Sequence, residues 1–365
     1  MLRYIFFFLL LCHGLIHLMG FAKAFGYSNL TRISSPASKK KGFVWLIVCL
    51  LLVISATGFL LKSAWWPVVA ILAIVISQVV IFASWKDSKF GTIPNLIILL
   101  VVITVWSGNQ FESQFIREVK AHLGSNNNSQ KDLLTETDIL SLPPPVQKYI
   151  RYSGAIGKPK LNNLRISFEG EMRGREIDWF PFTSIQYNFF NDPARLFFIR
   201  GKMYGLNVPG YHDYQNGRAR MNIKLFGTIR VVHAEGAGMD KTETVTYFND
   251  LCLFAPAALI DNRILWTTVD STSVQATFTN GLNKISAWLY FNKEDQLVNF
   301  ISDDRSPIDE TKAVRFSTPV KNYKSFNGRN IPTYGEAVWQ YPGKDFVYGK
   351  FNLKSIEYNV SEIKK

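Results

Sequence analysis

The chain has 365 residues, of which 47% are hydrophobic and 19% are charged, and its net charge is +13. This composition excludes an intrinsically disordered chain, which would be poor in apolar residues, and the length suits about two domains. Residues 1–107 carry nine Lys or Arg against the single acid Asp87, among long apolar runs. Basic residues beside apolar runs are typical of membrane-protein loops, so we expect no nucleic-acid partner.

Four apolar runs predict transmembrane helices, at about 4–22, 43–61, 66–85 and 94–107. A helix needs roughly 20 apolar residues to cross a bilayer. The first three runs meet this length, and the fourth meets it only if residues 90–93 join it. Tryptophans lie near the ends of the runs, as at a membrane interface. We therefore predict an α-helical membrane region of about four helices over residues 1–107, with the lipid bilayer as its partner.

The loops between these runs predict the orientation. The first loop carries Lys23, Arg32, Lys39, Lys40 and Lys41. The third loop carries Lys86 and Lys89 against Asp87. The positive-inside rule places both loops in the cytoplasm. The N-terminus and everything after residue 108 are then expected outside the cytoplasm.

The first run also has features of a cleaved signal peptide. Arg3 precedes an apolar stretch that ends at Ala22-Lys23-Ala24, a small-residue site. The stretch is long for a signal peptide and a lysine fits the site poorly, so we expect a retained span. Cleavage would leave three spans and would not change the side of the C-terminal region.

His13 and His17 are the ionisable pair inside the first run. They are four residues apart and therefore share one helix face. Ionisable residues within a span suggest a ligand to haem or metal, a proton relay or a lipid head-group site. The alternative is hydrogen bonding to a neighbouring helix. We favour this alternative because the other spans offer only Ser, Thr, Gln78 and Asn95 as polar partners.

Residues 108–160 predict an exit helix and a linker with short helices. Residues 111–123 have helical spacing, and the segment 124–129 is rich in Gly, Ser and Asn, which end helices. A helix over 135–150 is interrupted by the prolines 143–145. Because proline suits the first turn of a helix, a second short helix is expected to begin there and run to Arg151.

From residue 161 apolar and polar residues alternate, which predicts strands. About eleven such runs are separated by turn signals such as Asn216-Gly217 and Asn280-Gly281. Residues 241–261 instead have helical spacing, and we expect this helix to close one mouth of the sheet or to pack along its face. Residues 161–365 are therefore predicted to form a mainly antiparallel β half-barrel with a helical insertion.

Several segments resemble an uncharacterised bacterial family that joins N-terminal spans to a β-rich domain of unknown function. The segments are 14–17 and 20–26 in the first run, then 242–250, 253–259, Trp266 and 303–305. The β-rich part is also similar in layout to the half-barrel of periplasmic lipoprotein carriers, a curved sheet lidded by helices around an apolar cavity. The resemblance implies a bacterial protein, and the predicted topology then makes it a multi-pass protein of the cytoplasmic (inner) membrane with an extracytoplasmic domain. The likeness to the carriers is an analogy of fold and does not settle function. The topology, the sheet pattern and the aromatic content favour a lipid or a lipoprotein acyl chain as ligand.

The sequence holds no phosphate-binding loop, metal-binding motif or nucleophile motif, so we expect no cofactor and no metal. The polar residues Glu243, Asp250, Asp270 and Arg305 form the strongest constellation. Glu243 and Asp250 are seven residues apart and share a helix face. With Arg305 they are candidates for acid–base catalysis or for a charge cluster that fixes the helix on the sheet. We favour the second interpretation because no nucleophile motif accompanies them.

Aromatic residues are abundant in the β-rich part and suit an apolar pocket for an acyl chain. Ordinary core packing is the alternative. The predicted lining residues are Trp179, Phe182, Phe189, Phe198, Trp266, Phe278, Trp288 and Trp339.

These patterns favour a membrane-anchored extracytoplasmic binding protein for a hydrophobic ligand, acting in envelope lipid handling without catalysis. One alternative is an envelope hydrolase that uses Glu243 or Asp250. Another is a structural or sensory membrane protein that acts through His13 and His17. The sequence makes no prediction of oligomeric state.

Overall fold

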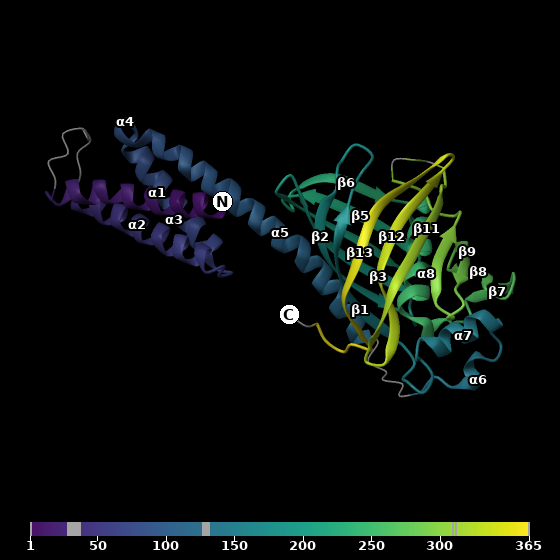
Figure 1. Ribbon diagram of the computed structural model, residues 1–365. Coiled ribbons are helices and arrows are strands. Elements are labelled where there is room, and N and C mark those ends of the chain that lie inside the picture. Colours follow the sequence, from purple (N-terminus) through teal and green to yellow (C-terminus); the bar gives the residue numbers. More distant parts are fainter. Residues whose placement is uncertain (1, 28–37, 126–131, 309, 311, 364–365) are drawn as a thin grey trace. The chain divides into compact units, whose positions relative to one another are not determined.

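A computed structural model of the chain describes residues 2–27, 38–125, 132–308, 310 and 312–363 (Figure 1). Arg32 of the first basic loop and residues 126–129 of the predicted linker lie outside the described residues. The chain divides into two units, Met1–Gln110 and Phe111–Lys365, which we call the N-terminal unit and the C-terminal unit.

The N-terminal unit is helical. Its elements are α1 (Leu2–Ala24), α2 (Lys39–Leu60), α3 (Trp66–Ala83), α4 (Trp85–Ser88), η1 (Lys89–Gly91) and the first part of α5 (Thr92–Ser125). Among the residues that the structure describes, four helical segments are long and apolar enough to cross a membrane, which confirms the expected helical region. The fourth predicted helix and the predicted exit helix are one continuous helix, α5.

Small residues bring α1 and α2 close together. A Cβ atom at Gly20 would lie 2.5 Å from the Trp45 ring, and one at Gly14 would lie 3.0 Å from the Leu52 Cβ. Such close packing is what helices in a bilayer use in place of a hydrophobic driving force. Leu10, Val48 and Leu52 form the centre of this packing and are fully buried.

The C-terminal unit is built on one antiparallel sheet, which confirms the predicted fold class. The sheet has thirteen strands rather than about eleven, in the order β6-β5-β4-β3-β2-β1-β13-β12-β11-β10-β9-β8-β7. The strands are β1 (Asn163–Met172), β2 (Phe180–Phe189), β3 (Ala194–Met203), β4 (Leu206–Gln215), β5 (Arg218–Leu225), β6 (Ile229–Glu235), β7 (Ile264–Thr268), β8 (Ser273–Asn280), β9 (Asn283–Phe291), β10 (Leu297–Ser302), β11 (Arg315–Phe326), β12 (Arg329–Tyr341) and β13 (Lys344–Tyr358).

The strand order explains the position of the helical insertion. The chain starts in the middle of the sheet at β1, reaches one edge at β6 and resumes at the opposite edge with β7. The connection between the edges is α8 (Ala237–Phe254) followed by η2 (Pro256–Ala258). Helix α8 contacts β4, β5 and β6 on one side and β9, β10 and β12 on the other, so it crosses the sheet, which curves around it (Figure 1). We call the face on which α8 packs the inner face.

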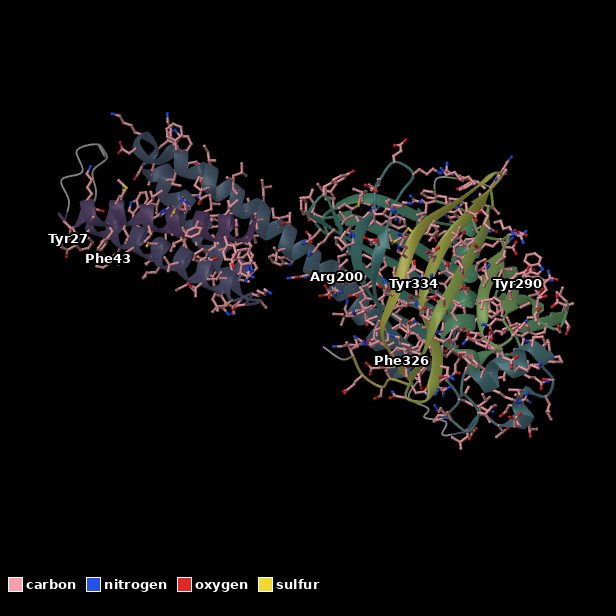
Figure 2. All side chains as sticks on the ribbon, in the orientation of Figure 1. Tyr27, Phe43, Arg200, Tyr290, Phe326 and Tyr334 are labelled. Atoms are coloured by element: carbon pink, nitrogen blue, oxygen red, sulfur yellow. The ribbon has the colours of Figure 1, made fainter. Side chains whose placement is uncertain are left out.

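The opposite, outer face of β2–β4 is also covered. Residues Phe111 and Phe115 of α5 pack on Phe198 and Tyr211. Arg200 of β3, labelled in Figure 2, forms an ion pair with Glu112 of α5. Because both faces are apolar, these strands are buried from both sides.

Two short helices, α6 (Glu136–Ile139) and α7 (Pro144–Tyr152), follow the residues left undescribed after α5. Helix α7 begins at the proline run, as the sequence predicts, with proline in its first turn. The Tyr149 hydroxyl donates to the Cys252 carbonyl at 3.0 Å, which ties α7 to α8.

Candidate functional site

A cavity of about 540 Å³ lies between the inner face of the sheet and α8. This volume is within the range of small-molecule sites in proteins. Its walls come from β1–β6, β11–β13, α8 and the segment after β10. Most lining residues are apolar, among them Phe197, Ile199, Ile223, Phe316, Trp339 and Phe351.

All four methionines of the C-terminal unit line this cavity: Met172, Met203, Met221 and Met239. Methionine is unbranched and has three rotatable bonds, so it adapts to ligands of different shape. The walls therefore suit a flexible apolar ligand.

Arg195 is the centre of a buried charged cluster in the cavity lining. Its Nε donates to Asp250 Oδ2 at 2.7 Å, and its Nη1 donates to Glu243 Oε2 at 3.2 Å. The three side chains are 8%, 10% and 2% exposed, respectively. Burial lowers the pKa of Arg195, but the charges of Asp250 and Glu243 outweigh burial and raise the pKa above its usual value. Arg195 therefore stays charged and fixes both acids of α8 to β3.

Two amides of β2 complete this cluster. Gln186 donates to Asp250 Oδ2 at 2.7 Å, and Asn188 donates to the same oxygen at 3.3 Å. Gln186 also accepts a hydrogen bond from Arg195 Nη2 at 3.1 Å. Burial raises the pKa of the Asp250 carboxyl above its usual value, although Arg195 and Asn188 oppose this shift. The cluster is thus a hydrogen-bonded network that joins two strands to α8.

The predicted role of Arg305 as partner of the two acids is wrong. Arg195 takes this position because its side chain projects from β3 toward α8. The Nη1 of Arg305 donates instead to the Tyr348 hydroxyl at 2.6 Å. Its guanidinium lies 4.0 Å from the centre of the Phe316 ring and 5.1 Å from that of Trp339. Arg305 nevertheless lines the same cavity.

Asp270 does not belong to the constellation either. It is exposed in the turn between β7 and β8. Its Oδ1 accepts from the Thr272 backbone N–H at 2.7 Å and from the Thr272 hydroxyl at 3.0 Å. This local hydrogen bonding is typical of aspartate in turns and explains why an aspartate occupies this position.

His212 is a further polar residue of the lining that sequence reasoning assigned to no site. Its Nδ1 lies 3.9 Å from Glu243 Oε1. Burial, and then the charges of Arg195 and Arg305, lower the pKa of His212 to about 3. The imidazole is therefore neutral at physiological pH.

Among the aromatic residues predicted to line a pocket, Trp339 lines the cavity and the others do not. Phe189 and Phe198 lie on the outer face, where they pack against α5. Phe278 is fully buried and stacks on Phe248 of α8, with ring centres 5.1 Å apart. Phe189 and Phe198 were assigned wrongly because both faces of the sheet are apolar, so alternation does not identify the face that holds the cavity. Phe278 lies on the inner face, but α8 covers it there.

The remaining predicted aromatics also lie elsewhere. Trp179 directly precedes β2. The Lys350 Nζ lies over the Trp179 ring, 4.1 Å from the ring centre. Phe182 packs on Phe351, and Trp288 packs with Arg315. Trp266 is on β7 at the sheet edge, outside the cavity lining. Phe180 and Phe197, which the aromatic pattern also offered as lining candidates, do line the cavity, whereas sequence reasoning missed the aromatics Phe168, Phe316, Phe346 and Tyr348 of the lining.

His13 and His17 belong to a buried hydrogen-bond network in the N-terminal unit. His13 Nε2 lies 2.8 Å from Asn95 Oδ1, and His17 Nε2 lies 2.9 Å from Ser77 Oγ. Asn95 Nδ2 donates to Ser77 Oγ and to Gln78 Oε1, each at 3.0 Å. The network joins α1, α3 and α5, which matches the hydrogen-bonding alternative. Within the described residues, no group of three or more His, Cys, Asp or Glu is placed to hold a metal ion.

The model of a Family of unknown function (DUF6544) matches residues 132–351, more than half of the chain. This match confirms the resemblance to a family that carries a β-rich domain of unknown function. No curated protein matches the chain.

Three solved structures resemble the chain distantly. A domain described as an outer membrane lipoprotein-sorting protein from Vibrio parahaemolyticus is 8% identical, covers 60% of this chain and 93% of its own, and has a TM-score of 0.36. A DUF1329 family protein from Desulfovibrio piger is 11% identical, with coverages of 59% and 92% and a TM-score of 0.36. A LolA superfamily protein from Nitrosomonas europaea is 8% identical, with coverages of 59% and 94% and a TM-score of 0.32. Such values carry no information about function.

Proposed function

We propose that this chain, which belongs to the Family of unknown function (DUF6544), is a membrane-anchored binding protein whose C-terminal unit holds an apolar ligand such as an acyl chain. The observation that carries the proposal is the cavity of about 540 Å³, walled by aromatic, aliphatic and methionine side chains. Apolar ligands gain free energy on entering such a cavity because their surface is removed from water.

The N-terminal helices supply the anchor in this proposal. Four helical segments within the described part of the chain are long and apolar enough to cross a membrane. The basic residues of the first and third loops favour a cytoplasmic position for these loops, which puts the C-terminal unit outside the cytoplasm. A protein of this design would bind lipid in the cell envelope, in keeping with a role in envelope lipid handling.

The charged cluster supports a binding role more than hydrolysis. Glu243 and Asp250 both accept hydrogen bonds from Arg195 and are almost fully buried. A general acid or base must have a proton-transfer position open to substrate. Their pairing with Arg195 favours a role in holding α8 across the sheet.

The test uses the full chain in lipid nanodiscs and dodecanol with a diazirine at the end of its chain. After irradiation, mass spectrometry identifies the labelled peptides. We expect adducts on lining segments of β3, β5 and α8, and excess unmodified dodecanol should remove them. Labelling confined to α1–α5 would contradict the proposal.

A matched pair of variants on one strand tests whether the cavity itself binds the probe. Val232 of β6 lines the cavity, whereas its neighbour Val231 is 53% exposed. Val232→Asp places a carboxylate in the cavity and should lower cavity labelling about tenfold or more, because an unpaired buried charge disfavours an apolar ligand. Val231→Asp adds the same charge outside the cavity and should leave labelling unchanged. Equal labelling of both variants would also contradict the proposal.

A further inference from the structure

The arginines of the cavity are not all paired. Arg195 and Arg175 have carboxylate partners, Arg195 in Asp250 and Glu243 and Arg175 in Glu310. Arg305 and Arg173 line the same cavity, and no carboxylate of the described residues lies within 4.0 Å of either guanidinium. The lining residues comprise four arginines and three acids, and Glu310, the partner of Arg175, brings the acids to four, so a missing partner is sought at the individual arginines.

Arg305 carries the clearest sign of a missing partner. Its Nε is buried and has no hydrogen-bond partner, and its Nη1 is used by the neutral Tyr348 hydroxyl. Arg305 is part-buried, and a buried donor left without a hydrogen-bond partner disfavours the empty state because its lost hydration is not replaced. An arginine in this condition suits a planar or tetrahedral anion, which accepts two parallel N–H bonds.

A second unpaired polar atom lies in the same lining. Asn249 of α8 is 6% exposed, and its Oδ1 is buried without a partner, while its Nδ2 donates to the Thr318 hydroxyl at 2.9 Å. Because the Thr318 hydroxyl can donate as well as accept, a half-turn of the amide presents an N–H to the cavity instead. Asn249 can therefore serve either the charged oxygen or a hydroxyl of a head group.

We propose that the ligand is an anionic amphiphile whose carboxylate or phosphate head group pairs with Arg305 while its chain lies against the apolar walls. This inference rests on the proposed function and specifies its ligand class. Glu243 and Asp250 do not supply the missing counter-charge, because both are hydrogen-bonded to Arg195. The head group would complete the hydrogen bonding of Arg305 and give its guanidinium a charged partner.

The test is competition against the diazirine probe in the full chain in nanodiscs. The competitors share a twelve-carbon chain and differ in head group: dodecanoate, dodecyl phosphate, dodecanol and dodecyltrimethylammonium, compared at equal free concentration. In the wild type we expect dodecanoate or dodecyl phosphate to displace the probe at least tenfold better than dodecanol. The better of the two anions identifies the source as a carboxylate or a phosphate head group.

Variants of Arg305 separate the head-group contact from chain binding. Arg305→Gln should reduce the preference for the anion over dodecanol to about twofold or less, with displacement by dodecanol unchanged. Arg305→Lys keeps the charge and should keep part of the preference. Arg315→Gln removes an exposed arginine of β11 outside the cavity and should keep all of it.

The outcomes distinguish the two proposals. If dodecanol displaces the probe as well as the anions do, or if dodecyltrimethylammonium is the best competitor, the head-group inference is overturned and chain binding stands. An unchanged preference in Arg305→Gln also overturns the inference. If no competitor displaces the probe, chain binding in the cavity fails and the inference fails with it.

Discussion

Replacing Arg195 by methionine should destabilise the C-terminal unit strongly. The side chain is 8% exposed and is the shared partner of two carboxylates that are 2% and 10% exposed. Removing one partner of a buried ion pair typically costs about 3–5 kcal/mol, because an uncompensated charge stays buried. We expect a loss of this size at pH 7.5 in the opening free energy of β3 and α8, measured by hydrogen exchange and mass spectrometry on the full chain.

The pH dependence gives this prediction its sign. Burial already raises the folded-state pKa of Asp250, and the loss of Arg195 should raise it further. A carboxyl whose pKa is raised on folding loses stability as the pH rises from its unfolded-state value through its folded-state value. The deficit of Arg195→Met should therefore be smaller at pH 5 than at pH 7.5.

Two further variants complete the experiment. Adding Glu243→Gln and Asp250→Asn to Arg195→Met removes the buried charges and should recover more than half of the deficit. Arg315→Met removes an exposed arginine and should change stability by about 0.5 kcal/mol or less. A deficit below about 1 kcal/mol, or one that the added neutral substitutions leave unchanged, would refute the role of Arg195 as the counter-ion of α8.

Three other predictions follow from buried groups. Phe278→Ala should cost about 3–5 kcal/mol in urea unfolding of the C-terminal unit, because the ring is fully buried and stacked on Phe248; a loss under 1 kcal/mol would contradict this core position. The pKa of His212 is lowered to about 3 in the folded state. As the pH falls below about 6.5, the unfolded chain therefore binds a proton at His212 that the folded chain does not bind, and the free energy of unfolding decreases. His212→Gln should therefore lose about 2 kcal/mol less than the wild type between pH 8 and pH 5, and parallel pH curves would argue against a buried neutral imidazole. Asn95→Leu should cost the N-terminal unit about 1–2 kcal/mol in detergent-induced unfolding, because Asn95 joins His13 to Ser77; a variant as stable as the wild type would show that the network adds nothing.

Most of the fold could be predicted from the sequence because its signals are local. The apolar runs predict α1–α3 by length alone, and the change from alternation to helical spacing marks α8. The continuity of α5 was missed because its composition changes from apolar to amphipathic near residue 108, where Ser107, Gly108 and Asn109 also favour a helix end, although α5 runs through them. Amino-acid composition indicates whether a segment is surrounded by apolar or by polar groups, and one helix such as α5 can continue through such a change.

The lining of the cavity could not be predicted because it depends on contacts between distant segments. On β3, Leu196 and Phe198 face α5, while Phe197 and Ile199 face the cavity, and all four are apolar. A sheet with one solvated face would have shown a clear polar alternation. Arg195 did leave a signal: a single charge within the apolar run 194–199 requires a buried partner.

The outer face of the sheet determines where this protein can be truncated without exposing an apolar surface. A fragment that begins after the polar segment 124–129 lacks the part of α5 that packs on Phe189, Leu196 and Phe198. A bare apolar face of this kind promotes self-association, and such a fragment should aggregate although it retains every strand. A fragment that begins at Phe111 keeps this cover and is the truncated chain to choose for soluble work. For this domain, the boundary that matters is set by the helix that covers the sheet.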